Sequence, residues 1–141
     1  MFYKAPVFDS DVSTWDVSSV TNMVGIFYEA HVFDSDISSW DVSSVTKMGS
    51  MFKRAHVFNS DISGWDVSSV NEMISLFQET KIFNNDISSW DVSAVTTMQE
   101  MFYGAEQFEQ KMCEWNLSRN TLLVKIFCLK KNLMIHLPIV L

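Results

Sequence analysis

The stretch DISSWDVSSV, residues 36–45, decides the fold because it recurs almost unchanged at a fixed spacing. The equivalent segments read DVSTWDVSSV at 11–20, DISGWDVSSV at 61–70, DISSWDVSAV at 86–95 and, in a divergent form, KMCEWNLSRN at 111–120. The period is 25 residues, without an insertion between units. Repetition at a fixed period of this length is typical of a solenoid, in which each coil packs on its neighbours.

Each 25-residue unit contains two different hydrophobic patterns. Over about 46–55, four hydrophobic residues follow the spacing i, i+3, i+4 and i+7, which is typical of a short helix; they are Met48, Met51, Phe52 and Ala55. Thr46 precedes this stripe, where a side-chain oxygen can cap the first helical turn. In the other half, Trp40 and Val42 alternate with polar residues, as in a short strand with one buried face.

The sequence therefore predicts an α/β solenoid that is leucine-rich-repeat-like, with one short parallel β-strand and one short helix in each 25-residue coil. Residues 1–125 form five complete coils, and residues 126–141 form a degenerate sixth coil or a C-terminal cap. Columns of Trp, Val, Met and Phe are expected to stack as ladders inside. Hydrophobic residues such as Leu129, Ile135 and Leu141 replace polar or small ones near the C-terminus. This apolar coil either folds back as a cap or marks a contact with a membrane surface or another chain, which includes self-association.

Composition narrows the classes of function. The formal net charge is −7, and residues 1–110 contain 5 basic and 16 acidic residues. An acidic body argues against nucleic-acid binding, which needs Lys and Arg on the binding face. No hydrophobic run reaches the roughly 18 residues of a membrane span, and no signal peptide is visible at the N-terminus. The two cysteines, Cys113 and Cys128, are interpreted as buried free thiols.

The repeating unit can be written MFxxAxxFxxDISxWDVSxVxxM, and in this form it resembles the repeat of BspA-like surface proteins, relatives of the leucine-rich-repeat proteins. The resemblance covers residues 1 to about 127. It implies a surface-exposed or secreted protein that contacts other molecules, often in adhesion, and it carries no catalytic residues with it. On this basis we expect the protein at the cell surface or outside the cell.

One face of the expected sheet is a candidate binding surface. If Trp40 and Val42 point inward, Asp41 between them must point outward. The same positions in four coils give a ladder of carboxylates beside a column of serines; these candidate ligand-binding residues are Asp16, Asp41, Asp66, Asp91, Ser18, Ser43, Ser68 and Ser93. Such a strip can be offered to a protein or glycan ligand. The competing interpretation is structural, with hydroxyls and backbone N–H groups satisfying the carboxylates.

Two further columns contain side chains of the kinds that bind metal ions. A second acidic column precedes the expected strand, and consists of Asp11, Asp36, Asp61 and Asp86. Its oxygens suit calcium, but the glycine and distal glutamate of a calcium loop are absent, so turn closure is the preferred interpretation. His31 and His56 occupy equivalent positions and can stack, yet the same column contains Lys81, which argues against a metal pair. We predict no metal site and no cofactor.

A repeating surface provides ladders of identical groups rather than a nucleophile, a base and an orienting group that converge in one pocket. The sequence therefore predicts a non-enzymatic protein- or glycan-binding repeat of a surface or secreted protein, which uses the Asp and Ser ladder. The alternative is a structural spacer or an end-to-end self-associating solenoid.

Overall fold

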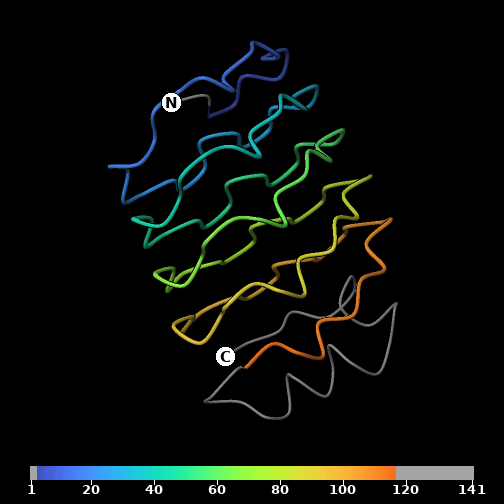
Figure 1. The fold of residues 1–141 in the computed structure, drawn as a ribbon. Helices are drawn as coiled ribbons and strands as arrows, with labels where there is room; N and C mark the ends of the chain where they lie inside the picture. The colour runs from blue at the N-terminus through green and yellow to red at the C-terminus, as the bar shows by residue number, and fades with distance from the viewer. Residues whose placement is uncertain (1–2, 117–141) are drawn as a thin grey trace.

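The structure, a computed structural model, describes residues 3–116, and Figure 1 shows this part of the chain winding as a stack of similar coils. Backbone hydrogen bonds join each coil to the next. The N–H of Met23 donates to the carbonyl of Lys47 at 2.9 Å, and the N–H of Phe27 donates to Met51 at 3.1 Å. One coil further on, the N–H of Met48 donates to Glu72 at 2.9 Å. The 25-residue period of the sequence is therefore the period of the stack.

The predicted fold class, one helix and one strand per coil, is wrong. Residues 3–116 contain no helix, and their β-structure is limited to isolated parallel bridges between equivalent residues of adjacent coils. These bridges join Asn22 to Lys47, Lys47 to Glu72, and Glu72 to Thr97. Each coil is built from tight turns instead, so the protein is not an α/β solenoid.

The predicted helix over about 46–55 is replaced by overlapping turns. The N–H groups of Met51 and Ala55 donate to carbonyls three residues earlier, at 3.2 and 2.9 Å. Ser50 and Arg54 have φ values of 55° and 61°, in the left-handed region that interrupts a right-handed helix. A helix of two turns has only marginal stability by itself. In this segment every second backbone N–H group donates to a carbonyl of the next coil instead of to one within a helix.

The burial that the pattern predicted is nevertheless confirmed, because Met48, Met51, Phe52 and Ala55 are all fully buried.

The predicted strand at Trp40–Val42 is also replaced by turns. The N–H of Trp40 donates to the carbonyl of Ile37 at 3.1 Å, and the N–H of Val45 donates to Val42 at 2.9 Å. Thr46 does not cap a helix; its hydroxyl donates to the carbonyl of Thr21 in the preceding coil at 3.1 Å. Trp40 and Val42 are buried and Asp41 is exposed, as the alternating pattern predicted.

Aromatic side chains form the centre of the core. The rings of Phe27, Phe52, Phe77 and Phe102 stack from coil to coil, with centroids 5.7–5.8 Å apart. The tryptophan Nε1–H groups also join the coils, because Trp65 donates to the carbonyl of Ile37 in the preceding coil at 3.1 Å. Trp40, Trp90 and Trp115 make the equivalent bond. Packing and hydrogen bonding therefore share the same period.

Several predictions about the C-terminal part fall outside the described residues, among them the sixth coil or cap over 126–141 and self-association through it. Cys113, predicted to be a buried free thiol, is disulfide-bonded. It is also exposed, because it occupies the turn position held by serine in earlier coils. Within residues 3–116, no helix is long and apolar enough to cross a membrane.

Candidate functional site

The structure places the four predicted aspartates in one row along the stack, exposed in each coil. We call Asp16, Asp41, Asp66 and Asp91 the acidic row. In the second coil, Oδ1 of Asp41 accepts from the backbone N–H of Ser43 at 3.1 Å and from its hydroxyl at 2.6 Å. The same pair of bonds holds Asp16 on Ser18 and Asp66 on Ser68. Ser18, Ser43 and Ser68 therefore satisfy one oxygen of these three carboxylates, and the candidate binding role of the row stays a prediction.

These bonds lower the pKa values of the row. The hydroxyl and then the backbone N–H of Ser43 lower the pKa of Asp41 below its ordinary value of 3.8, while repulsion from Asp16 raises it by a smaller amount. The pKa of Asp66 is lowered in the same way by Ser68, against repulsion from Asp41 and Asp91. Hydrogen bonding outweighs the like-charge repulsion, and the row is ionised at neutral pH, as aspartates of ordinary pKa also are.

The second acidic column closes turns, as predicted. Oδ1 of Asp36 accepts from the N–H of Ser38 at 2.9 Å, and Asp11, Asp61 and Asp86 bond to the serine two residues later in the same way. Two residues earlier in each coil, Asp34 accepts from the N–H of Asn59 at 2.8 Å, so this column joins coils. Among the described residues, no group of three or more His, Cys, Asp or Glu side chains is arranged to hold a metal ion.

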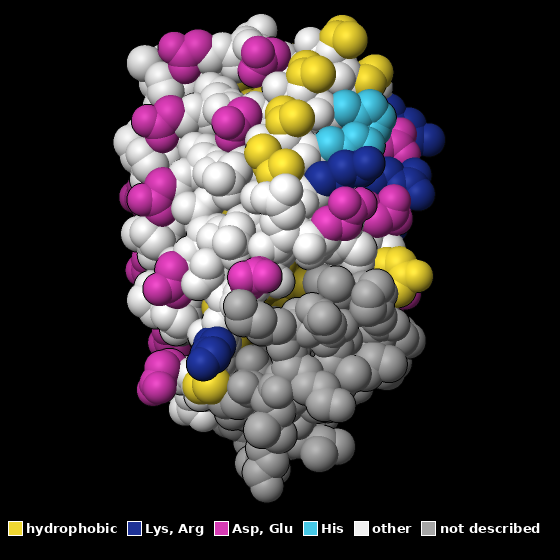
Figure 2. Space-filling model, turned by 90° about the vertical axis from the view of Figure 1, so that its right-hand side faces the viewer, with side chains coloured by type: hydrophobic (Ala, Val, Ile, Leu, Met, Phe, Trp, Pro, Cys, Tyr) yellow, Lys and Arg dark blue, Asp and Glu magenta, His cyan; other side chains and the backbone are white. Residues whose placement is uncertain are grey.

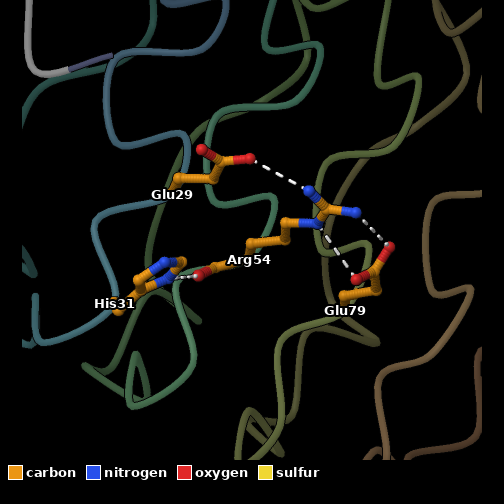
Figure 3. A network of polar contacts seen from close by, with 4 residues as sticks. All are labelled: Glu29, His31, Arg54 and Glu79. Carbon is orange, nitrogen blue, oxygen red and sulfur yellow. Dashed lines mark hydrogen bonds and ion pairs between the residues drawn. The ribbon is translucent and has the colours of Figure 1, made fainter. Parts of the chain in front are cut away.

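An ion-pair network between three coils was missed at the sequence level. Arg54 donates through Nη1 to Oε1 of Glu29 and through Nε to Oε2 of Glu79, both at 3.0 Å (Figure 3). The pKa of Arg54 is raised, first by Glu79 and then by Glu29. The sequence does contain a signal for this network, because Glu29, Arg54 and Glu79 occupy the same position in successive units and alternate in charge.

The two histidines stack, as their spacing allowed. The rings of His31 and His56 lie 4.5 Å apart at 5°, and Nδ1 of His31 is 2.9 Å from the carbonyl oxygen of Arg54. A carbonyl can only accept, so this nitrogen of His31 carries a proton. The pair therefore belongs to the coil-to-coil contacts beside Arg54.

A cavity of about 380 Å³ lies at the first and second coils. Its walls are mainly hydrophobic, including Trp15, Met23, Phe27 and Trp40, and Asp16 is the one ionisable residue that lines it. A nucleophile and an adjacent base do not meet there. The cavity therefore offers no catalytic arrangement of the kind that covalent or acid–base chemistry needs.

These features define a repeat protein made of stacked, turn-built coils with an exposed row of ionised carboxylates. The chain matches the family described as "Mycoplasma protein of unknown function, DUF285" over residues 1–71 and 41–136, and it belongs to that family. No curated protein and no solved structure matches the chain. The resemblance to BspA-like repeats stays a prediction.

Proposed function

We propose that this protein is a non-enzymatic binding repeat whose ligand contacts the acidic row and its serines. The observation that carries the proposal is the even spacing of exposed carboxylates that are held in one orientation by their own turns. The bonds within residues 3–116 that hold Asp16, Asp41 and Asp66 use Oδ1, which leaves Oδ2 of each available to a partner.

A cationic protein segment fits this surface better than a neutral glycan. The row carries one negative charge per coil at neutral pH, and Lys or Arg side chains are the natural donors to carboxylates. Expected contacts are hydrogen bonds to the free oxygens, with serine hydroxyls at the margin. The resemblance to surface proteins supports a place at the cell surface or outside the cell.

The second candidate function is a structural spacer. It is favoured by the hydrogen bonds and stacked rings that link every described coil to the next, because such continuous links make a stiff rod. The acidic row is not needed for this role.

A double substitution in the row tests the binding proposal. D41N/D66N keeps an oxygen that can accept the turn bonds but removes two charges. We expect the variant to bind a short poly-lysine peptide at least about tenfold more weakly than the unsubstituted protein, since charged hydrogen bonds at the contact are lost. Isothermal titration calorimetry measures the change.

The matched control is D36N/D61N, which removes two charges from the turn-closing column of the same two coils. It should weaken binding much less. An equal loss of poly-lysine affinity in both variants would show that binding depends only on the net charge of the protein. Unchanged affinity in D41N/D66N would exclude the acidic row as the contact. Absence of any poly-lysine binding would overturn the choice of a cationic ligand.

A further inference from the structure

The first coil of the described stack, blue in Figure 1, leaves open core positions that the later described coils bury. Trp15 is 41% exposed, whereas its equivalents Trp40 and Trp65 are 5% and 4% exposed. Val20 is half-buried, whereas its equivalent Val45 is fully buried. The cavity of about 380 Å³ lies at this opening, and its walls include Trp15 and Val20.

The side of the stack has a different character. On the side that Figure 2 shows, hydrophobic side chains of the described residues form a narrow line among charged and other polar groups. The cavity at the first coil is instead mainly hydrophobic, and its volume of about 380 Å³ lies within the range of about 300–1,000 Å³ that is typical of ligand pockets. The first coil therefore offers a hydrophobic side chain a place to enter the core.

The backbone beside this cavity has unpaired hydrogen-bonding groups. In the second coil, the N–H of Thr46 donates to the carbonyl of Thr21 at 2.9 Å, but the N–H of Thr21 has no acceptor among residues 3–116. The carbonyls of Asn22 and Val24 have no donor among the same residues, whereas the equivalent carbonyls of the second coil accept at 2.9 and 3.0 Å. Asn22 also lines the cavity. We call Thr21, Asn22, Val24 and the cavity beside them the open edge.

The structure shows what covers an edge of this kind one coil further on. Residues 19–25, with the sequence SVTNMVG, lie on the equivalent edge of the second coil. The N–H of Met23 donates to the carbonyl of Lys47, and the N–H of Gly25 donates to that of Gly49. The side chain of Met23 is buried, and Gly25 has a φ of 63°, which glycine adopts without a steric cost.

We propose that the open edge binds an extended peptide with the pattern Val-x-x-Met-x-Gly, which is the pattern of residues 20–25. The N–H groups of its methionine and glycine donate to the carbonyls of Asn22 and Val24, and the N–H of Thr21 donates to its backbone. Its valine and methionine side chains enter the cavity. In such strand addition, main-chain hydrogen bonds give affinity and pockets give specificity. The contacts are backbone groups and hydrophobic walls rather than carboxylates, so the inference does not rest on the proposed function.

An NMR titration of the isotope-labelled full chain with the peptide acetyl-SVTNMVG-amide tests the open edge. A short linear peptide loses conformational entropy on binding, so we expect a dissociation constant on the order of 1 mM. Saturable shifts should appear in the amide signals of Thr21, Asn22 and Val24, and the paired amide of Thr46 should not respond. The peptide carries no charged group, and D41N/D66N should therefore bind it as the unsubstituted protein does.

Two N-methylated peptides form a matched pair that cannot affect the folding of the protein. Methylation of the peptide's methionine nitrogen removes the donor to the carbonyl of Asn22, and we expect the shifts to be lost at the same peptide concentration. Methylation of the peptide's asparagine nitrogen removes an N–H that, within residues 19–25 of the described stack, donates to no carbonyl. This second peptide should still produce the shifts.

A substitution in the protein tests the cavity. V20D places a carboxylate in the cavity wall and should abolish the shifts, because the charge opposes entry of a hydrophobic side chain. The matched control is V32D, at a residue that is 43% exposed and outside the cavity, and it should leave peptide binding unchanged. Melting temperatures check that both variants fold.

Four results would overturn the proposal: no shifts, shifts away from the open edge, equal shifts with the two methylated peptides, or equal shifts in V20D and the unsubstituted protein. Sedimentation velocity of the free protein examines a different occupant. Self-association that V20D abolishes would assign the open edge to a second copy of the chain and overturn the choice of a peptide.

Discussion

At the scale of single residues, His56 and the aspartates make stability depend on pH in two ranges. Burial of the His56 ring, followed by the nearby charges of His31 and Lys81, lowers its pKa from 6.5. The folded protein therefore binds this proton less tightly than the unfolded chain, and stability falls as the pH drops below 6.5. The aspartates have pKa values lowered from 3.8, so their contribution is lost only as the pH falls below that value.

The melting temperature should accordingly fall in two steps on acidification, one below about pH 6.5 and one below about pH 3.8. H56Q removes the ring that titrates, and we expect it to reduce the first step and to leave the second. Thermal unfolding followed by circular dichroism across the pH range measures both. A first step of unchanged size in H56Q would assign it to other groups.

Trp65 stabilises the stack through both its ring and its N–H. The ring is 4% exposed, and Nε1 donates to the carbonyl of Ile37, which also accepts from the N–H of Trp40. Trp65→Ala should cost about 3–5 kcal/mol by leaving a cavity. Trp65→Phe loses the donor and some ring volume, and we expect a cost of about 2 kcal/mol. Urea unfolding gives both values, and equal costs would show that ring packing contributes little.

At the scale of the structural element, the turn segment over residues 48–55 depends on left-handed residues. Ser50 has a φ of 55°, and its equivalent in the first coil is Gly25, with a φ of 63°. A non-glycine residue pays a steric cost in this region that glycine does not. Glycine at this position should therefore stabilise the turn, whereas in the middle of a helix it would be destabilising.

Ser50→Gly should raise the free energy of unfolding by up to about 1 kcal/mol, whereas Ser50→Val should lower it by about 1–2 kcal/mol. A helix over the same residues would give the opposite sign for glycine, at a cost of about 1 kcal/mol. The control is Ser44→Gly, in a turn without a left-handed serine, where no gain is expected. Urea unfolding of the three variants decides between turn and helix.

At the scale of the whole molecule, stacking converts columns of the sequence into continuous surfaces. The acidic row, the stacked phenylalanines and the stacked histidines each come from one position of the 25-residue unit. A substitution in one coil therefore changes one step of a long surface, and binding should respond in proportion to the number of coils changed. This is why the proposed test of binding alters two coils of the row together.

The sequence by itself determined the period, the buried columns and the outward position of Asp41, because hydrophobic side chains leave water wherever the backbone permits it. Secondary structure was decided only in the tertiary structure. The spacing of Met48, Met51, Phe52 and Ala55 fits a helix and overlapping turns equally well. The choice depends on where the backbone N–H groups find acceptors, and those of Met48 and Phe52 find them 24 residues later, in the next coil. The bridge from Arg54 to Glu29 and Glu79 likewise exists only because the coils stack in register.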